Sequence, residues 1–141
     1  MFTKILVPTD GSEYSRRALL VAIELGRKFN AEIVLLNVLM TPEALGYTLS
    51  EDAAVLQQQI NPNGEATLVA TTKDIDLDGV KLTCRLKPGY PASVILDEIV
   101  SEDIDLVVMG YRGYTSLAGT FMGSVSQKVL AKASQPVLLI K

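Results

Sequence analysis

The segment GYRGYTSLAGTFMGS, residues 110–124, follows an apolar run and contains four glycines. Gly110 and Gly113 are separated by two residues, and nine more residues precede Gly123 and Ser124. Because glycine has no Cβ, its backbone N–H can approach phosphate oxygens closely. The free N–H groups of a helix that begins at Gly123 and Ser124 would favour an anion in the same place. The spacing therefore predicts a phosphate-binding loop.

Three side chains near this loop could assist phosphate binding. The hydroxyls of Ser124 and Ser126 can donate hydrogen bonds to phosphate oxygens, and the Arg112 guanidinium can offset their charge. The alternative is an ordinary loop in which glycine and serine only cap the following helix. Tyr111 and Tyr114 are interpreted as loop-surface or dimer contacts rather than as platforms for a base.

A second polar loop follows the first apolar run at VPTDGS, residues 7–12. Its acid, Asp10, can cap the next helix with Glu13 in a capping box, contact a ligand, or do both. The chain contains neither the GxxxxGK[ST] pattern of a P-loop nor the three-glycine dinucleotide fingerprint. Those two modes of nucleotide binding are therefore disfavoured.

The chain has no histidine and a single cysteine, Cys84. Ser-His-Asp and Cys-His mechanisms are excluded, and a metal site would have to consist of carboxylates and other oxygen ligands. Cys84 lies in the alternating segment VKLTCRL, which predicts a half-buried strand position rather than a reactive thiol. We expect no catalytic residues and no protein metal ligands; Asp10 is the one obvious acid near the predicted loop.

Length and charge indicate the class of protein. The 141 residues fit one domain, 1–141, with one compact core. The net charge of −3 with no basic run argues against nucleic-acid binding. The N-terminal apolar run is too short for a signal peptide and no segment is long enough to span a membrane, so we expect a cytoplasmic protein without membrane insertion.

Apolar runs alternate with helical periodicity along the chain. The runs predict five strands, mostly buried on both faces, at residues 3–8, 31–40, 80–86, 105–110 and 136–141. Helical stripes predict helices at residues 12–30, 65–75, 90–103 and 123–135, the first capped by Asp10 or Ser12. In the third of these helices, Val94, Ile95, Ile99 and Val100 are expected to point inward.

The remaining segment, residues 41–63, is interpreted as a long, mobile connection with some helical character. The order of elements predicts an α/β fold, in which one parallel sheet carries helices on both faces. Ligands of such sheets bind outside the carboxyl ends of the strands, where the winding direction reverses. If the first and fourth strands are neighbours there, both polar loops meet over one crevice.

The segments KILVPTDGSEYSRRAL, GYPASVI, DLVVMGYRGYTSLAGTFMGSVSQKVL and PVLLIK together resemble the universal stress protein family over almost the full length of the chain. ATP-binding members of that family carry glycine, two residues, glycine, nine residues, then glycine and Ser or Thr. This chain matches that pattern in full. The resemblance implies a Rossmann-like, five-stranded parallel sheet in the order 3-2-1-4-5, which would place the first and fourth strands side by side.

The resemblance also implies a nucleotide site. Pro8, Thr9 and Asp10 would line the adenosine, Val38 would contact the adenine ring, and Met109 and Gly110 would border the ribose. The phosphates would be surrounded by Arg112, Gly113, Gly123, Ser124, Val125 and Ser126. ATP would carry a divalent ion, Mg²⁺ or Mn²⁺, on its phosphates.

The function implied is that of an ATP-binding, dimeric stress-response regulator that acts through a signalling protein whose identity the sequence does not give. The apolar end of the chain, Val137, Leu138, Leu139 and Ile140, would pair with a second copy across a two-fold axis. Burial of this strand under the last helix alone is the alternative. A slow ATPase and a nucleotide-independent interaction module remain as alternative functions.

Overall fold

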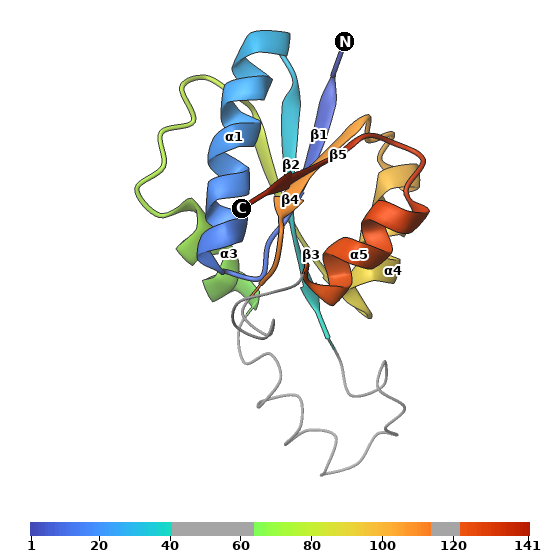
Figure 1. Ribbon diagram of the computed structural model, residues 1–141. Helices are drawn as coiled ribbons and strands as arrows, with labels where there is room; N and C mark the ends of the chain where they lie inside the picture. The colour runs from blue at the N-terminus through green and yellow to red at the C-terminus, as the bar shows by residue number, and fades with distance from the viewer. Residues whose placement is uncertain (41–63, 114–121) are drawn as a thin grey trace.

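The structure, a computed structural model, describes residues 1–40, 64–113 and 122–141. The predicted mobile connection, residues 41–63, and most of the nine-residue span between Gly113 and Gly123 lie outside the described residues. In the described part, the chain forms a parallel sheet of five strands with helices on both faces (Figure 1). The predicted fold class is therefore confirmed.

The five strands have the bounds Lys4–Pro8 (β1), Glu32–Leu39 (β2), Leu82–Pro88 (β3), Leu106–Gly110 (β4) and Val137–Ile140 (β5). Their order in the sheet is β3-β2-β1-β4-β5, and every neighbouring pair is parallel. This is the order that the family resemblance implied. β1 lies between β2 and β4, so the winding direction reverses at β1.

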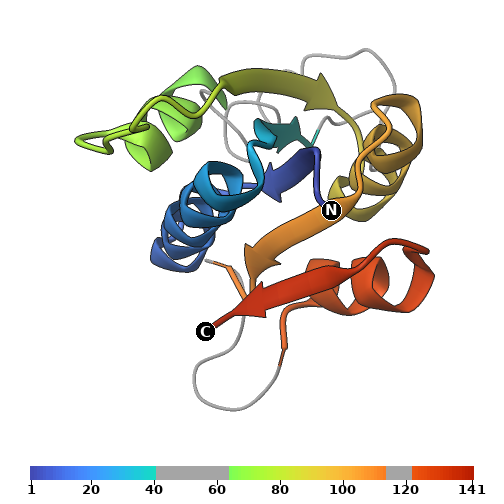
Figure 2. The same cartoon turned by 90° about the horizontal axis from the view of Figure 1, so that it is seen from above.

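The helices have the bounds Glu13–Phe29 (α1), Gly64–Thr72 (α3), Pro91–Ser101 (α4) and Ser124–Lys132 (α5). α1 and α3 cover one face of the sheet, and α4 and α5 cover the other (Figure 2). Because side chains alternate along a strand, Ile5 and Val7 of β1 pack under α1, while Leu6 packs towards α4 and α5. The central strands are thus buried on both sides. No helix among the described residues is long and apolar enough to cross a membrane.

One expectation for the helices was wrong. Val100 was expected to point inward, but its side chain is 74% exposed, because α4 turns Ile95 and Ile99 towards the sheet instead. The position that α4 buries in addition is Glu98, which is 0% exposed. Of the two N-caps expected for α1, Asp10 and Ser12, the structure has Ser12, whose side chain accepts a hydrogen bond from the Ser15 N–H.

β3 departs from the predicted pattern because it is an edge strand. It begins at Leu82, two residues later than expected, and Cys84 is exposed rather than half-buried. On the α4 side β3 carries two cations, where the central strands carry aliphatic residues. These are Arg85 and Lys87, and both reach the buried Glu98 carboxylate at 2.6 Å.

The ion pairs continue from Glu98 across the α4 face of the sheet. Arg85 Nη1 lies 3.0 Å from Glu102 Oε1, and Lys4 Nζ lies 2.9 Å from Glu102 Oε2. Lys4 in turn lies 3.5 Å from Glu32 on β2. We call Lys4, Arg85, Lys87, Glu98 and Glu102 the α4 ion network; it connects β1, β3 and α4.

We predict that removing the two cations of Glu98 destabilises the protein more than removing Glu98 itself. In Arg85→Met/Lys87→Met a fully buried carboxylate loses its partners, which costs about 3–5 kcal/mol of unfolding free energy. In Glu98→Gln the two cations are still about one-third exposed and can be rehydrated, so the loss is smaller. Urea unfolding of both variants measures the difference. Equal losses would contradict a buried, charged Glu98.

The network also predicts a contribution to acid sensitivity. The Lys4 ammonium, by its hydrogen bond, is the largest influence that lowers the pKa of Glu102 below its ordinary value of 4.5. The stability that this shift provides is present above pH 4.5 and is lost as the pH falls through the lower pKa of the folded state. We therefore expect Glu102→Gln to lose less stability than the wild type between about pH 6 and about pH 3.

Urea unfolding midpoints along a pH series test this expectation. Glu24→Gln is the control, because Glu24 is an exposed glutamate on α1, away from the network. Its pH profile should follow the wild type. If the Glu102→Gln profile does so as well, the ion pairs of Glu102 do not stabilise the fold.

Candidate functional site

The two polar loops identified in the sequence meet at the carboxyl ends of β1 and β4. The strands are paired through Ile5 with Leu106 and Leu6 with Val107, so the loops that follow them leave the sheet side by side. The contact is close: a Cβ added to Gly113 would overlap the carboxylate of Asp10. The first and fourth strands are neighbours, as expected, and the two polar loops meet; the crevice between them stays a prediction.

The loop after β1 is held by internal hydrogen bonds. The Thr9 hydroxyl accepts from the Gly11 N–H at 3.0 Å and lies 2.7 Å from the Thr71 hydroxyl of α3. Asp10 Oδ1 accepts from the Ser12 N–H at 2.9 Å. The Thr9 side chain is therefore committed to the interior between α1 and α3, whereas Asp10 is exposed at the edge of the sheet.

Gly110 is required by the packing of β4 against α1. A Cβ at this position would lie 2.7 Å from the Cβ of Tyr14, on the first turn of α1. Real Cβ atoms do not approach this closely, so any larger residue would have to push α1 from the sheet. The sequence suggested that this glycine gives a phosphate access to the backbone. The structure shows that the fold itself needs the glycine.

α5 begins directly beside the loop after β4. Its N-cap, Gly123, donates its N–H to the Tyr111 carbonyl at 3.0 Å, and a Cβ on Gly123 would lie 3.1 Å from Arg112 Cα. The first hydrogen bond of the helix runs from the Gln127 N–H to the Gly123 carbonyl. The N–H groups of residues 124–126 therefore precede the helical ladder, at the positive end of the helix dipole. The first turn carries no acidic residue.

The two serines of this turn have different roles. Ser124 is exposed at the helix start. Ser126 is buried and donates its hydroxyl to the Gly110 carbonyl at 2.9 Å, which ties α5 to the end of β4. A hydroxyl has one proton to donate, so in this structure Ser126 gives it to the protein. Of the two donors of Ser126, only the backbone N–H then faces the helix start. The residue type alone does not indicate this difference between Ser124 and Ser126.

The apolar residues predicted to contact the nucleoside come from three adjacent strands. Pro8 ends β1, Val38 lies near the end of β2, and Met109 lies near the end of β4. Val38 and Met109 pack in the core on the α4 and α5 face, and Pro8, two residues after Leu6, lies on the same face of β1. Pro8 and Met109 are buried, and Val38 is half-buried. The structure thus brings all three to the edge of the sheet where α5 begins.

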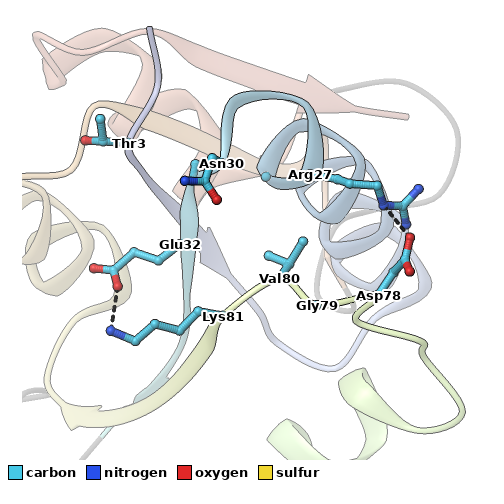
Figure 3. A pocket seen from close by; sticks show the side chains of 10 residues that line it. Thr3, Arg27, Asn30, Glu32, Asp78, Gly79, Val80 and Lys81 are labelled. Carbon is cyan, nitrogen blue, oxygen red and sulfur yellow. Dashed lines mark ion pairs between the residues drawn. The ribbon is translucent and has the colours of Figure 1, made fainter.

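A surface cavity of about 450 Å³ lies at the opposite edge of the sheet (Figure 3). It is lined by the end of α1, by residues at the starts of β1 and β2, and by the segment before β3, and it contains none of the residues predicted for the site. Its charges are paired with one another: Arg27 lies 2.7 Å from Asp78, and Lys81 lies 2.8 Å from Glu32. This cavity is therefore separate from the candidate site.

Comparisons with known proteins give a consistent result. The family model described as the universal stress protein family matches residues 1–141. A universal stress protein of Thermus aquaticus, encoded in the QAH/OAS sulfhydrylase 3′ region, is 34% identical over 142 residues, which cover 100% of both chains.

Two solved structures have a fold similar to that of this chain. The first, of the hypothetical protein MJ0577 of Methanocaldococcus jannaschii, has a TM-score of 0.82 and 28% identity, and the match covers 100% of this chain and 96% of that one. The second is of the universal stress protein of Archaeoglobus fulgidus in complex with dAMP. It has a TM-score of 0.66 and 22% identity and covers 99% of this chain and 98% of that one.

We predict that Gly110→Ala destabilises the protein in the absence of any ligand. The added methyl group would overlap Tyr14, and relieving such overpacking costs about 1–3 kcal/mol of unfolding free energy. Chemical denaturation without nucleotide measures the loss. Ser134→Ala, an exposed change in the turn before β5, is the control and should stay within about 0.5 kcal/mol of the wild type. An unchanged Gly110→Ala would mean that the fold does not need glycine there.

Proposed function

Because this chain belongs to the universal stress protein family, we propose that it is an ATP-binding, dimeric stress-response regulator whose nucleotide lies at the carboxyl ends of β1 and β4. The observation that carries this proposal is the start of α5. Three backbone N–H groups precede the helical ladder there, beside the Gly110–Gly113 loop and with no acidic residue in the first turn. Such a helix start favours an anion, and phosphate is the anion that the glycine spacing indicates.

The phosphates of ATP would lie between α5 and the loop after β4. The N–H groups of Ser124, Val125 and Ser126 would donate to their oxygens, and Arg112 would offset their charge. Gly113 and Gly123 let the surrounding segments approach closely, since a Cβ on Gly113 would meet Asp10 and a Cβ on Gly123 would meet Arg112. Mg²⁺ or Mn²⁺ would be carried by the phosphates.

The nucleoside would lie against the ends of the central strands. Pro8, Val38 and Met109 provide an apolar edge on one face, while Thr9 and Asp10 provide backbone and carboxylate groups beside it. The Archaeoglobus relative in complex with dAMP supports an adenine nucleotide as the ligand class. Because dAMP has one phosphate, that relative does not indicate how many phosphates the ligand of this chain carries. The proposal of ATP as the nucleotide is based on the glycine pattern.

Calorimetric titration of the purified chain with ATP and Mg²⁺ tests the proposal. We expect saturable binding, and we expect Gly123→Val to weaken it about 10-fold or more, or ~1.4 kcal/mol, because the side chain would separate α5 from Arg112. Ser134→Val is the matched control: it introduces the same side chain at an exposed position at the far end of α5 and should bind like the wild type. Absence of binding by the wild type at millimolar ATP would favour the interaction-module alternative.

Phosphate release measured in the same samples separates a regulator from a slow ATPase. The chain has no histidine, and Asp10 already accepts a hydrogen bond from the Ser12 N–H, so we expect release at the rate of buffer alone. Release that rises with protein concentration and is lost in Gly123→Val would establish turnover instead.

The dimer would form through β5. β5 pairs with β4 on one side and forms an edge of the described sheet, and its Leu138 side chain is 39% exposed. An exposed apolar edge strand offers unpaired backbone groups to a second copy of the same strand. The cytoplasmic location and the signalling partner stay predictions from the sequence and the family.

We predict that Leu138→Lys shifts the protein from dimer to monomer. A lysine on an edge strand opposes strand pairing, because its charge would be buried against the second copy. Light scattering at micromolar concentration measures the molar mass, and Leu20→Lys serves as control, since Leu20 is an exposed leucine on α1. A monomeric wild type would refute pairing through β5.

A further inference from the structure

We propose that Tyr14 is a positioning residue for phosphate recognition, because it holds the Arg112 guanidinium in one orientation beside the start of α5. This inference rests on the proposed function, since it concerns how the same site would recognise its ligand. Neither the glycine spacing nor the family resemblance assigned a role to Tyr14 in the site. The assignment comes from contacts between α1 and the loop after β4.

Tyr14 makes two contacts with Arg112 that constrain it in different ways. Arg112 Nε donates a hydrogen bond to the Tyr14 hydroxyl at 2.9 Å. The guanidinium carbon also lies 5.3 Å from the centre of the Tyr14 ring, within the range of a cation–π interaction. The hydrogen bond constrains the direction of the side chain, and the cation–π interaction keeps the guanidinium near the ring.

These contacts leave the ligand-binding edge of the guanidinium available. Arginine has five N–H donors in a planar fork, and the bond to Tyr14 uses the one on Nε. The four donors on the two Nη nitrogens are not used by Tyr14, and together they can bind a phosphate in a bidentate manner. A fork that is already oriented loses less side-chain entropy when the phosphate binds, and this favours affinity.

The backbone around Tyr14 keeps the pair in register. Tyr14 lies on the first turn of α1, and the missing side chain of Gly110 lets β4 approach its Cβ directly. On the other side, Arg112 Cα lies where a Cβ on Gly123 would be only 3.1 Å away. Arg112 is thus held between the start of α1 and the start of α5, and its side chain reaches back onto α1.

A second arginine near Tyr14 is directed elsewhere. Arg17 lies 5.4 Å from the Tyr14 ring centre, but it is also 3.7 Å from Glu13 and donates to the Lys141 carbonyl at 3.1 Å. Arg17 lies on α1, and its side chain extends towards the end of β5. Of these two cations, Arg112 is the one adjacent to the start of α5, so the role of Tyr14 in the site acts through Arg112.

The inference predicts a selective loss of affinity in Tyr14→Phe. The ring and its packing remain, but Arg112 loses its hydrogen-bond acceptor, so we expect ATP to bind about 3- to 10-fold more weakly. Binding of adenosine, which has no phosphate, should be unchanged. In an Arg112→Ala background the same substitution should have no further effect on ATP binding, because residues that act through one contact are not additive.

Calorimetry with ATP and adenosine on the wild type, Tyr14→Phe, Arg112→Ala and the double variant tests this. Tyr111→Phe is the matched control, because it removes a tyrosine hydroxyl from the residue directly before Arg112. The Tyr111 ring faces Lys141, whose Nζ lies 5.5 Å from the ring centre. Thermal unfolding of each variant without ligand separates loss of affinity from loss of fold. The Arg112 Nε–H signal in NMR adds a readout without nucleotide, since it should exchange with water faster in Tyr14→Phe than in the wild type.

Three outcomes would overturn the inference while leaving the proposed function intact. These are wild-type ATP affinity in Tyr14→Phe, an equal loss for ATP and adenosine, and additive losses in the double variant. A wild type that binds no adenine nucleotide would instead overturn the proposed function, and with it the role of Tyr14 in the site. In that case the NMR exchange rate would still decide whether Tyr14 holds Arg112.

Discussion

The pairing of β1 with β4 is the constraint on which the rest of this structure depends. β1 is the first strand, yet it lies in the middle of the sheet, because the chain adds β2 and β3 on one side before it crosses to add β4 and β5 on the other. Right-handed crossovers then place α1 and α3 on one face and α4 and α5 on the other. The loops after β1 and β4 therefore leave the sheet side by side but turn to opposite faces, which is the geometry that forms a ligand crevice.

Much of this framework could be predicted from the sequence, because strands buried on both faces and amphipathic helices have distinct patterns of residue types. What the pattern could not provide is the partner of each polar group. Glu98 occupies a helical position where a glutamate would ordinarily face water, and it is buried because Arg85 and Lys87 lie on a strand that is adjacent only in three dimensions. Val100 was misassigned for the same reason, since the α4 face that turns to the sheet is chosen in part by this charge.

The candidate site was likewise predictable from the sequence only in part. The spacing of Gly110, Gly113 and Gly123 predicted a phosphate loop and attributed all three glycines to phosphate access, without indicating what each glycine contacts in the fold. In the structure each of them lies against protein atoms, of Tyr14, Asp10 and Arg112 respectively. The glycines allow the two loops and the start of α5 to approach one another. A glycine pattern of this kind indicates, before any ligand chemistry, that segments of the chain approach one another closely.

The α4 ion network also acts on the pairing of β3 with its neighbour. β3 is an edge strand of the described sheet, and a shift of its register by one residue would move every side chain to the other face of the sheet. Such a shift would take Arg85 and Lys87 away from α4 and leave the carboxylate of Glu98 buried without a counter-ion. The misaligned sheet would thus be heavily penalised, although its backbone hydrogen bonds could re-form. The buried charge therefore favours the native alignment of the last strand on this side of the sheet over alignments shifted by one residue.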